Sequence, residues 1–254
     1  MTAVSAIAIQ VQPRTACRAF AYKLHTAQGV FMDTGFWHRR WHKNEIAFHE
    51  KNVNPLLLKH FGALSLQKDQ RVFVPLCGKT LDIAWLRAQG FRVVGAELIP
   101  LAIEQLFAEL GVQPTITDAG TLKHYSAENI DIFVGDIFAL DAGMLGLADA
   151  VYDRAALVAL PEDMRVLYAQ HLMQLTDNAP QLLICYEYDQ STQAGPPFSV
   201  SGNEVKKHYE RNYTIKALES IDVPGGLKGL SPAKESVWLL KNKWYKKSRI
   251  KRLF

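Results

Sequence analysis

The chain has 254 residues, of which 48% are hydrophobic and 21% are charged, a composition typical of a folded globular protein. The net charge is +4 with a pI of about 8.9, but the cations are concentrated at the two ends. Residues 1–31 carry three cations and no acid, and residues 242–254 carry six and no acid, which leaves the residues between them at −5. We therefore expect no nucleic-acid partner for the central part of the chain.

Cysteine usage and hydropathy limit the class of protein further. No apolar stretch approaches the roughly 18 residues that a membrane-spanning helix needs. The three cysteines, Cys17, Cys77 and Cys185, are odd in number and far apart, which predicts neither a disulfide framework nor a metal cluster. We therefore expect a cytoplasmic protein with no metal and no membrane partner.

The apolar, basic residues 1–31 have two interpretations that stay open. They are either a transit-type targeting segment or a leader foreign to the native protein, with Met32 as its start. We favour the leader because Met32 immediately precedes a segment rich in residues of the binding type. In either case we expect a catalytic domain over 32–241 and a solvated basic tail over 242–254.

The first predicted element is a helix in the segment 36–49, FWHRRWHKNEIAFH. Trp37 and Trp41 are four residues apart, and Phe48 lies nearly three turns after Trp37, so one helix would carry all three rings on one face. Such a face either packs the helix onto the domain or forms a lid over an apolar or cationic ligand. We expect the lid. Pro55 then begins a short helix.

Residues 71–97 form the most informative stretch of the chain. The apolar run 72–76 predicts a buried strand, and a turn follows at 77–79. Apolar residues then recur every three or four positions until Gly90, which predicts a helix ended by a left-handed glycine. A second apolar run closes on Glu97. This strand–turn–helix–strand unit is the opening of a nucleotide-binding α/β sheet.

Two residues of this unit indicate a ligand. Gly78 has no Cβ and allows the backbone after the first strand to approach one closely. Glu97, nineteen residues later, is placed to accept both hydroxyls of a ribose. A single glycine offers no cradle for a pyrophosphate, so a nucleoside without phosphates fits better. The alternative is an ordinary βαβ unit in which Glu97 is a surface residue.

The rest of the chain continues the alternation. A helix is predicted over 100–110, ended by Gly111, and residues 113–125 are interpreted as a polar excursion. Further strands are predicted over 130–134, 149–153, 181–188, 213–221 and 236–240, with helices from Pro161 and over 204–211. Asp136 and the pair Asp153-Arg154 come at strand ends, so we expect them along the same sheet edge as Glu97.

Several motifs together resemble the thiopurine S-methyltransferase family. They are FWHRRW, AFH, VNP, VPLCGKTLD, VVGAEL, GDIFAL, YDRAALVALP and GPPFSV, and the resemblance covers about residues 33–241. It implies a Rossmann-like, seven-stranded, mostly parallel sheet with helices on both faces and an N-terminal helical lid. It also implies S-adenosylmethionine as cofactor and a small aromatic or heterocyclic thiol as methyl acceptor. Some bacterial members act on selenium or tellurium species, and we expect a monomer.

The resemblance also implies roles for individual residues. Trp41 and Leu76 would contact the cofactor, Glu97 its ribose, and Asp136 and Ile137 its adenine. Phe48 would border the acceptor, and Arg154 would lie between cofactor and acceptor as the catalytic residue. A guanidinium there would favour the reactive thiolate form of the acceptor. The alternative for Arg154 is a structural salt bridge to Asp153 or another neighbour.

Two other functions are weaker interpretations. Cys77-Gly78-Lys79-Thr80 prompts a P-loop nucleotide-binding enzyme, but that loop needs glycine where Phe73 stands inside the strand. The basic tail prompts nucleic-acid binding, which would be salt-sensitive and lost on deleting 242–254. Cys77 itself is interpreted as a small packing residue rather than a nucleophile.

Overall fold

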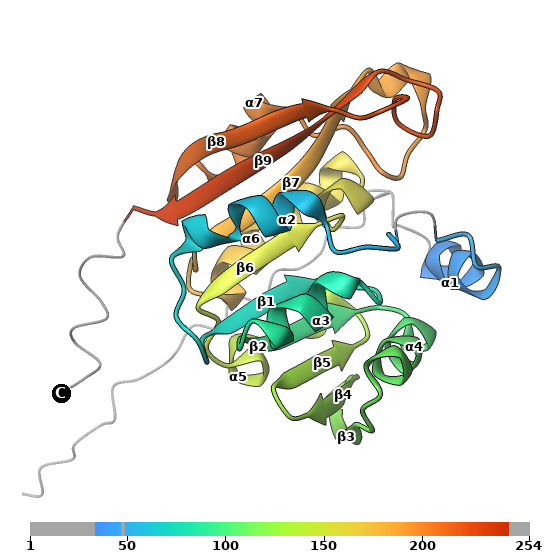
Figure 1. The fold of residues 1–254 in the computed structure, drawn as a ribbon, viewed down its shortest axis with the longest axis vertical. Coiled ribbons are helices and arrows are strands. Elements are labelled where there is room, and N and C mark those ends of the chain that lie inside the picture. Colours follow the sequence, from blue (N-terminus) through green and yellow to red (C-terminus); the bar gives the residue numbers. More distant parts are fainter. Residues whose placement is uncertain (1–33, 47–48, 244–254) are drawn as a thin grey trace, which may run out of the picture.

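The structure is a computed structural model that describes residues 34–46 and 49–243 (Figure 1). The segment 1–31 and residues 244–254 of the basic tail lie outside the described residues, as does Phe48. The helices are α1 (Thr34–His42), α2 (Pro55–His60), α3 (Leu81–Ala88), α4 (Pro100–Leu110), α5 (Ala142–Leu145), α6 (Glu162–Leu175) and α7 (Gly202–Tyr209). Short 3₁₀ turns are η1 (Phe61–Leu64), η2 (Ile137–Ala139), η3 (Leu157–Ala159) and η4 (Gln190–Thr192).

One mixed sheet runs through the described part of the chain. Its strands are β1 (Arg71–Pro75), β2 (Arg92–Glu97), β3 (Thr115–Ala119), β4 (Leu122–Ala127), β5 (Ile130–Val134), β6 (Ala150–Arg154), β7 (Gln181–Tyr188), β8 (Tyr213–Asp222) and β9 (Ala233–Asn242). They lie in the order β3-β4-β5-β2-β1-β6-β7-β9-β8. The five central strands from β5 to β7 pair in parallel, and both flanks pair antiparallel.

The prediction of seven strands is wrong, because the sheet has nine. The two additional strands, β3 and β4, come from the stretch interpreted as a polar excursion. Four of the five residues of β3 are exposed, so this edge strand has no apolar alternation for sequence analysis to detect. Its strand conformation comes from antiparallel pairing with β4, which in turn pairs with β5.

Alternating strand residues build one core on each face of the sheet. On one face, Phe73 and Val151 pack with helices α6 and α7. On the other face, Val72 and Tyr152 pack with α2, α3 and α4. The central strands are therefore mostly apolar on both faces, and the sequence shows β1 and β2 as apolar runs.

Helix α1 is shorter than the predicted helix over 36–49. It ends at His42, where the chain turns through Lys43 and Asn44, the latter with φ of +55°. Residues 42–45 are hydrophilic and exposed, so they bury no apolar surface that would stabilise a further helical turn. The expected single helical face from Trp37 to Phe48 is therefore wrong. Within the described residues, no helix has both the length and the apolarity that a membrane crossing requires.

Candidate active site

The predicted site positions meet at one edge of the sheet. Strands β5, β2, β1 and β6 are parallel neighbours, so their carboxyl ends lie side by side. Leu76 follows the end of β1, Glu97 ends β2, Asp136 follows β5, and Arg154 ends β6. Figure 1 shows α1 beyond the arrowheads of the central strands, at the same edge. The prediction that these strand ends come together is confirmed.

Glu97 anchors the backbone around the site. Its side chain is buried, with Oε2 accepting a hydrogen bond from the Gly78 amide at 2.7 Å and Oε1 accepting one from the Ile99 amide at 2.9 Å. Burial raises the pKa of this carboxyl, although the backbone amides of Ile99 and Gly78 oppose the shift. The alternative of a surface Glu97 is therefore wrong.

The loop after β1 has an unusual backbone. Leu76 has φ of +45°, a left-handed conformation that costs a non-glycine residue about 1–2 kcal/mol. The Cys77 amide donates a hydrogen bond to the Ala96 carbonyl at 3.0 Å. The next amide, that of Gly78, donates to the Glu97 carboxylate. These two hydrogen bonds join the loop after β1 to the end of β2 and hold the strained backbone in place.

Trp41 lies against this loop. Its side chain is 4% exposed and packs with Ile46, Ile99 and Ala102. A Cβ on Gly78, whose φ is +52°, would lie 3.3 Å from Trp41 Cζ2. Because Gly78 has no side chain, the Trp41 ring can pack against its backbone. From the sequence, we expected a ligand to approach the backbone at this position.

Asp136 and Ile137 occupy different environments. Asp136 is exposed, and its Oδ1 accepts a hydrogen bond from the Phe138 amide at 3.0 Å, which caps η2. Ile137 is buried in the core, and its carbonyl oxygen lies 2.9 Å from His171 Nε2. Of these two side chains, Asp136 is therefore the one that solvent reaches at the sheet edge.

Arg154 is largely buried, and its Nη2 forms an ion pair with Glu50 Oε1. Asp153 lies on the opposite face because side chains alternate along a strand. It accepts hydrogen bonds from the Tyr168 hydroxyl at 2.7 Å and the Leu157 amide at 3.1 Å. Burial raises the pKa of Asp153 to about 6. Arg154 therefore forms a salt bridge, as the alternative interpretation expected, but it does so with Glu50 and not with Asp153.

Glu50 was missed by sequence analysis. It lies 104 residues from Arg154 in the chain and belongs to none of the motifs quoted above. The only signal in the sequence is that Glu50 and Arg154 have opposite charges. Opposite charge alone does not select one acid among the 25 in the chain.

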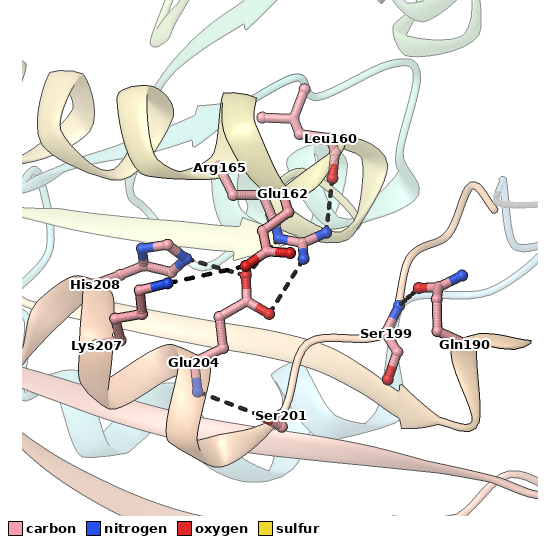
Figure 2. Close-up of polar contacts among 9 residues, drawn as sticks. All are labelled: Leu160, Glu162, Arg165, Gln190, Ser199, Ser201, Glu204, Lys207 and His208. Atoms are coloured by element: carbon pink, nitrogen blue, oxygen red, sulfur yellow. Dashed lines mark hydrogen bonds and ion pairs between the residues drawn. The ribbon is translucent and has the colours of Figure 1, made fainter. Parts of the chain in front are cut away.

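A partly buried ion pair joins α6 to α7 (Figure 2). Arg165 of α6 donates from Nε and Nη2 to the two carboxylate oxygens of Glu204 in α7, at 2.6 and 3.1 Å. It also donates from Nη1 to the Leu160 carbonyl at 2.9 Å, just after η3. Burial acts against ionisation of Glu204, but hydrogen bonds from His208 and Arg165 hold its pKa below the ordinary value.

The structure also decides the two minor interpretations of the loop after β1. Phe73 is fully buried within β1, so the glycine-rich phosphate loop of a P-loop enzyme is absent here. Cys77 is buried in the core, and burial raises the pKa of its thiol well above the ordinary value. A thiol in that state is a packing residue, as predicted.

Solved structures of methyltransferases share this fold. A 1,6-didemethyltoxoflavin-N1-methyltransferase from Burkholderia thailandensis, solved with S-adenosylhomocysteine, superposes with a TM-score of 0.58 at 17% identity, over 83% of this chain and 87% of that one. A SAM-dependent methyltransferase from Anabaena variabilis superposes with a TM-score of 0.52 at 16% identity, over 82% and 95%. The fold is that of the class I S-adenosylmethionine-dependent methyltransferases.

Sequence comparison then gives the family. The family model for thiopurine S-methyltransferase (TPMT) matches residues 32–247. A thiopurine S-methyltransferase from Xanthobacter autotrophicus is 57% identical over 210 residues, 82% of this chain and 99% of that protein. One from Teredinibacter turnerae is 53% identical over 209 residues, 82% and 97%. The chain belongs to the thiopurine S-methyltransferase family and is a methyltransferase with S-adenosylmethionine as its cofactor.

The residues at the sheet edge fit this cofactor. A carboxylate has about four acceptor positions, and the Gly78 and Ile99 amides use two of those on Glu97. Each of the two oxygens accepts one of these amides, so a ribose hydroxyl can still bind there. One carboxylate can therefore fix the loop and still accept a nucleoside.

Proposed function

We propose that the chain methylates the sulfur of small aromatic or heterocyclic thiols of the thiopurine type. Selenium and tellurium species are further candidate acceptors. The observation that carries the proposal is the largely buried guanidinium of Arg154 at the end of β6, one strand from the loop that Glu97 fixes. The names of the relatives support the thiol class.

The chain's own residues would orient the reactants. When bound, the cofactor supplies a methyl group already activated by its sulfonium, so the protein contributes position and charge. Arg154 would stabilise the acceptor as a thiolate and keep it in line with the methyl group. It cannot remove the proton itself, because a guanidinium stays protonated.

We assign the remaining site residues by the same proposal. Glu97 would bind the ribose, and the other cofactor-binding residues would be Trp41, Leu76, Gly78, Asp136, Ile137 and Arg154. Phe48 and Arg154 would contact the acceptor. The methyltransferase domain would span 32–241, between the leader 1–31 and the basic tail 242–254.

The proposal includes a monomer that acts in the cytoplasm on a small molecule, with no nucleic-acid or membrane partner. Among the large hydrophobic side chains exposed in the described residues, Leu58 lies on α2, Leu167 on α6 and Leu230 between β8 and β9. Isolated apolar residues of this kind are normal on a monomer surface. The negative charge of the central part of the chain supports the absence of a nucleic-acid partner.

The test is acceptor-dependent formation of S-adenosylhomocysteine from S-adenosylmethionine. We expect product with 6-mercaptopurine and thiophenol. We expect none with phenol or aniline, which have the benzene ring of thiophenol but an oxygen or a nitrogen in place of its sulfur. Methylation of phenol or aniline in place of the thiols would refute the acceptor class. Salt-sensitive DNA binding that disappears on deletion of 242–254 would instead favour the nucleic-acid alternative.

A further inference from the structure

The guanidinium assigned to the acceptor already has an anion beside it. Arg154 has a side chain that is 9% exposed, and its Nη2 pairs with Oε1 of Glu50, whose side chain is 38% exposed. Arg154 comes from the end of β6, whereas Glu50 belongs to the segment between α1 and α2. The ion pair therefore places the Glu50 carboxylate at the carboxyl edge of the sheet, beside the end of β6.

Two other acids, Asp82 and Glu235, act electrostatically on Arg154. Asp82 is 1% exposed, and its two carboxylate oxygens accept hydrogen bonds from the Asn54 amide at 2.8 Å and the Tyr152 hydroxyl at 2.9 Å. Glu235 is half-buried in β9, where burial raises its pKa although Arg154 opposes the shift. Glu50 has a side chain that is 38% exposed, and it pairs directly with Arg154. It is therefore the acid that a ligand can displace.

An anionic ligand at Arg154 meets Glu50 in one of two ways. If it takes the same guanidinium N–H, the Glu50 carboxylate must leave. If it takes another N–H, the two anions lie close together and repel each other. In both cases Glu50 lowers the affinity of the site for anions and leaves its affinity for neutral ligands of the same shape almost unchanged.

We propose that Glu50 is a specificity-determining residue that competes with anionic methyl acceptors for Arg154. It sets how strongly the site prefers an ionised acceptor over a neutral one. This inference rests on the proposed function, because it takes Arg154 to be the acceptor's partner.

The test uses the full chain saturated with S-adenosylhomocysteine and measures ligand binding by calorimetry. The probes are benzoate, a planar aromatic anion, and benzamide, its neutral analogue. In Glu50→Gln we expect benzoate to bind about tenfold tighter than in the wild type, with benzamide changed less than twofold. The control is Glu128→Gln, which removes the same charge from an exposed residue between β4 and β5 and should change neither value.

Benzoate affinity in Glu50→Gln that is unchanged or weaker overturns the inference, as does a failure of both proteins to bind benzoate. If Glu50→Gln does not fold, Glu50→Asp provides the same test. Its carboxylate is one methylene shorter and pairs less well with Arg154, so its benzoate affinity should lie above that of the wild type. Equal affinity in a folded Glu50→Asp would then overturn the inference.

The thiol assay separates this inference from the proposed function. A wild type that methylates thiols while Glu50→Gln binds benzoate no tighter refutes the role of Glu50 alone. A wild type that methylates no thiol while Glu50→Gln binds benzoate tighter refutes the acceptor class and leaves the competition at Arg154 standing.

Discussion

Replacing Glu97 with glutamine tests whether one carboxylate both fixes the loop after β1 and binds the cofactor. The amide oxygen can still accept one of the two backbone amides, but the amide nitrogen faces the other donor. One buried N–H is then unsatisfied, which costs about 1–3 kcal/mol of the free energy of unfolding. The loss should be near the lower end, because the substitution also removes a buried charge whose pKa burial raises.

Cofactor affinity should fall more clearly than stability. Hydrogen bonds to a charged acceptor are worth about 1.5–3 kcal/mol and those to a neutral one about 0.5–1.5 kcal/mol. The glutamine oxygen can still accept from one ribose hydroxyl and its N–H can donate to the other, so two charged bonds become two neutral ones at a cost of roughly 2–3 kcal/mol. This corresponds to a Kd for S-adenosylhomocysteine about 30- to 150-fold higher.

Calorimetry with S-adenosylhomocysteine and urea unfolding measure the two effects separately. The matched control is Glu104→Gln, which removes an exposed carboxylate from α4 and should change neither quantity. If Glu97→Gln loses stability but binds S-adenosylhomocysteine within twofold of the wild type, Glu97 anchors the loop and does not bind the ribose.

Three further predictions follow from the same edge of the sheet. Arg154→Ala should lower kcat/KM for thiols about 100-fold, roughly 2.7 kcal/mol, and Arg154→Lys less; wild-type rates for thiols of both high and low pKa would show that Arg154 is structural. Gly78→Ala should lower the free energy of urea unfolding by about 1 kcal/mol or more, since it places a Cβ at positive φ and 3.3 Å from Trp41; unchanged stability would mean that the ring moves freely. Because the pKa of Asp153 is raised to about 6, the folded chain keeps this proton when the unfolded chain has lost it. The wild type should therefore lose on the order of 3 kcal/mol relative to Asp153→Asn between about pH 4 and pH 6, and a constant difference would contradict this.

The sequence by itself determined the central elements of this protein. Strands β5 and β7 have the predicted bounds, and α4 runs from Pro100 to Leu110, followed by Gly111 with φ of +66°. These signals are local, because a strand buried on both faces is mostly apolar and proline and glycine mark helix ends. Parallel strands then bring their carboxyl ends to one edge, so Glu97 and Arg154 could be placed there in advance.

Only the tertiary structure decided the features that depend on distant partners. The exposed strand β3 exists through its pairing with β4, and α1 stops at His42, where the exposed residues 43 and 44 form a turn. Glu97 binds the amide of Gly78, and Glu50 pairs with Arg154 across 104 residues. A hydrophobic pattern records which side chains are buried, but it does not record which polar group each buried charge will meet.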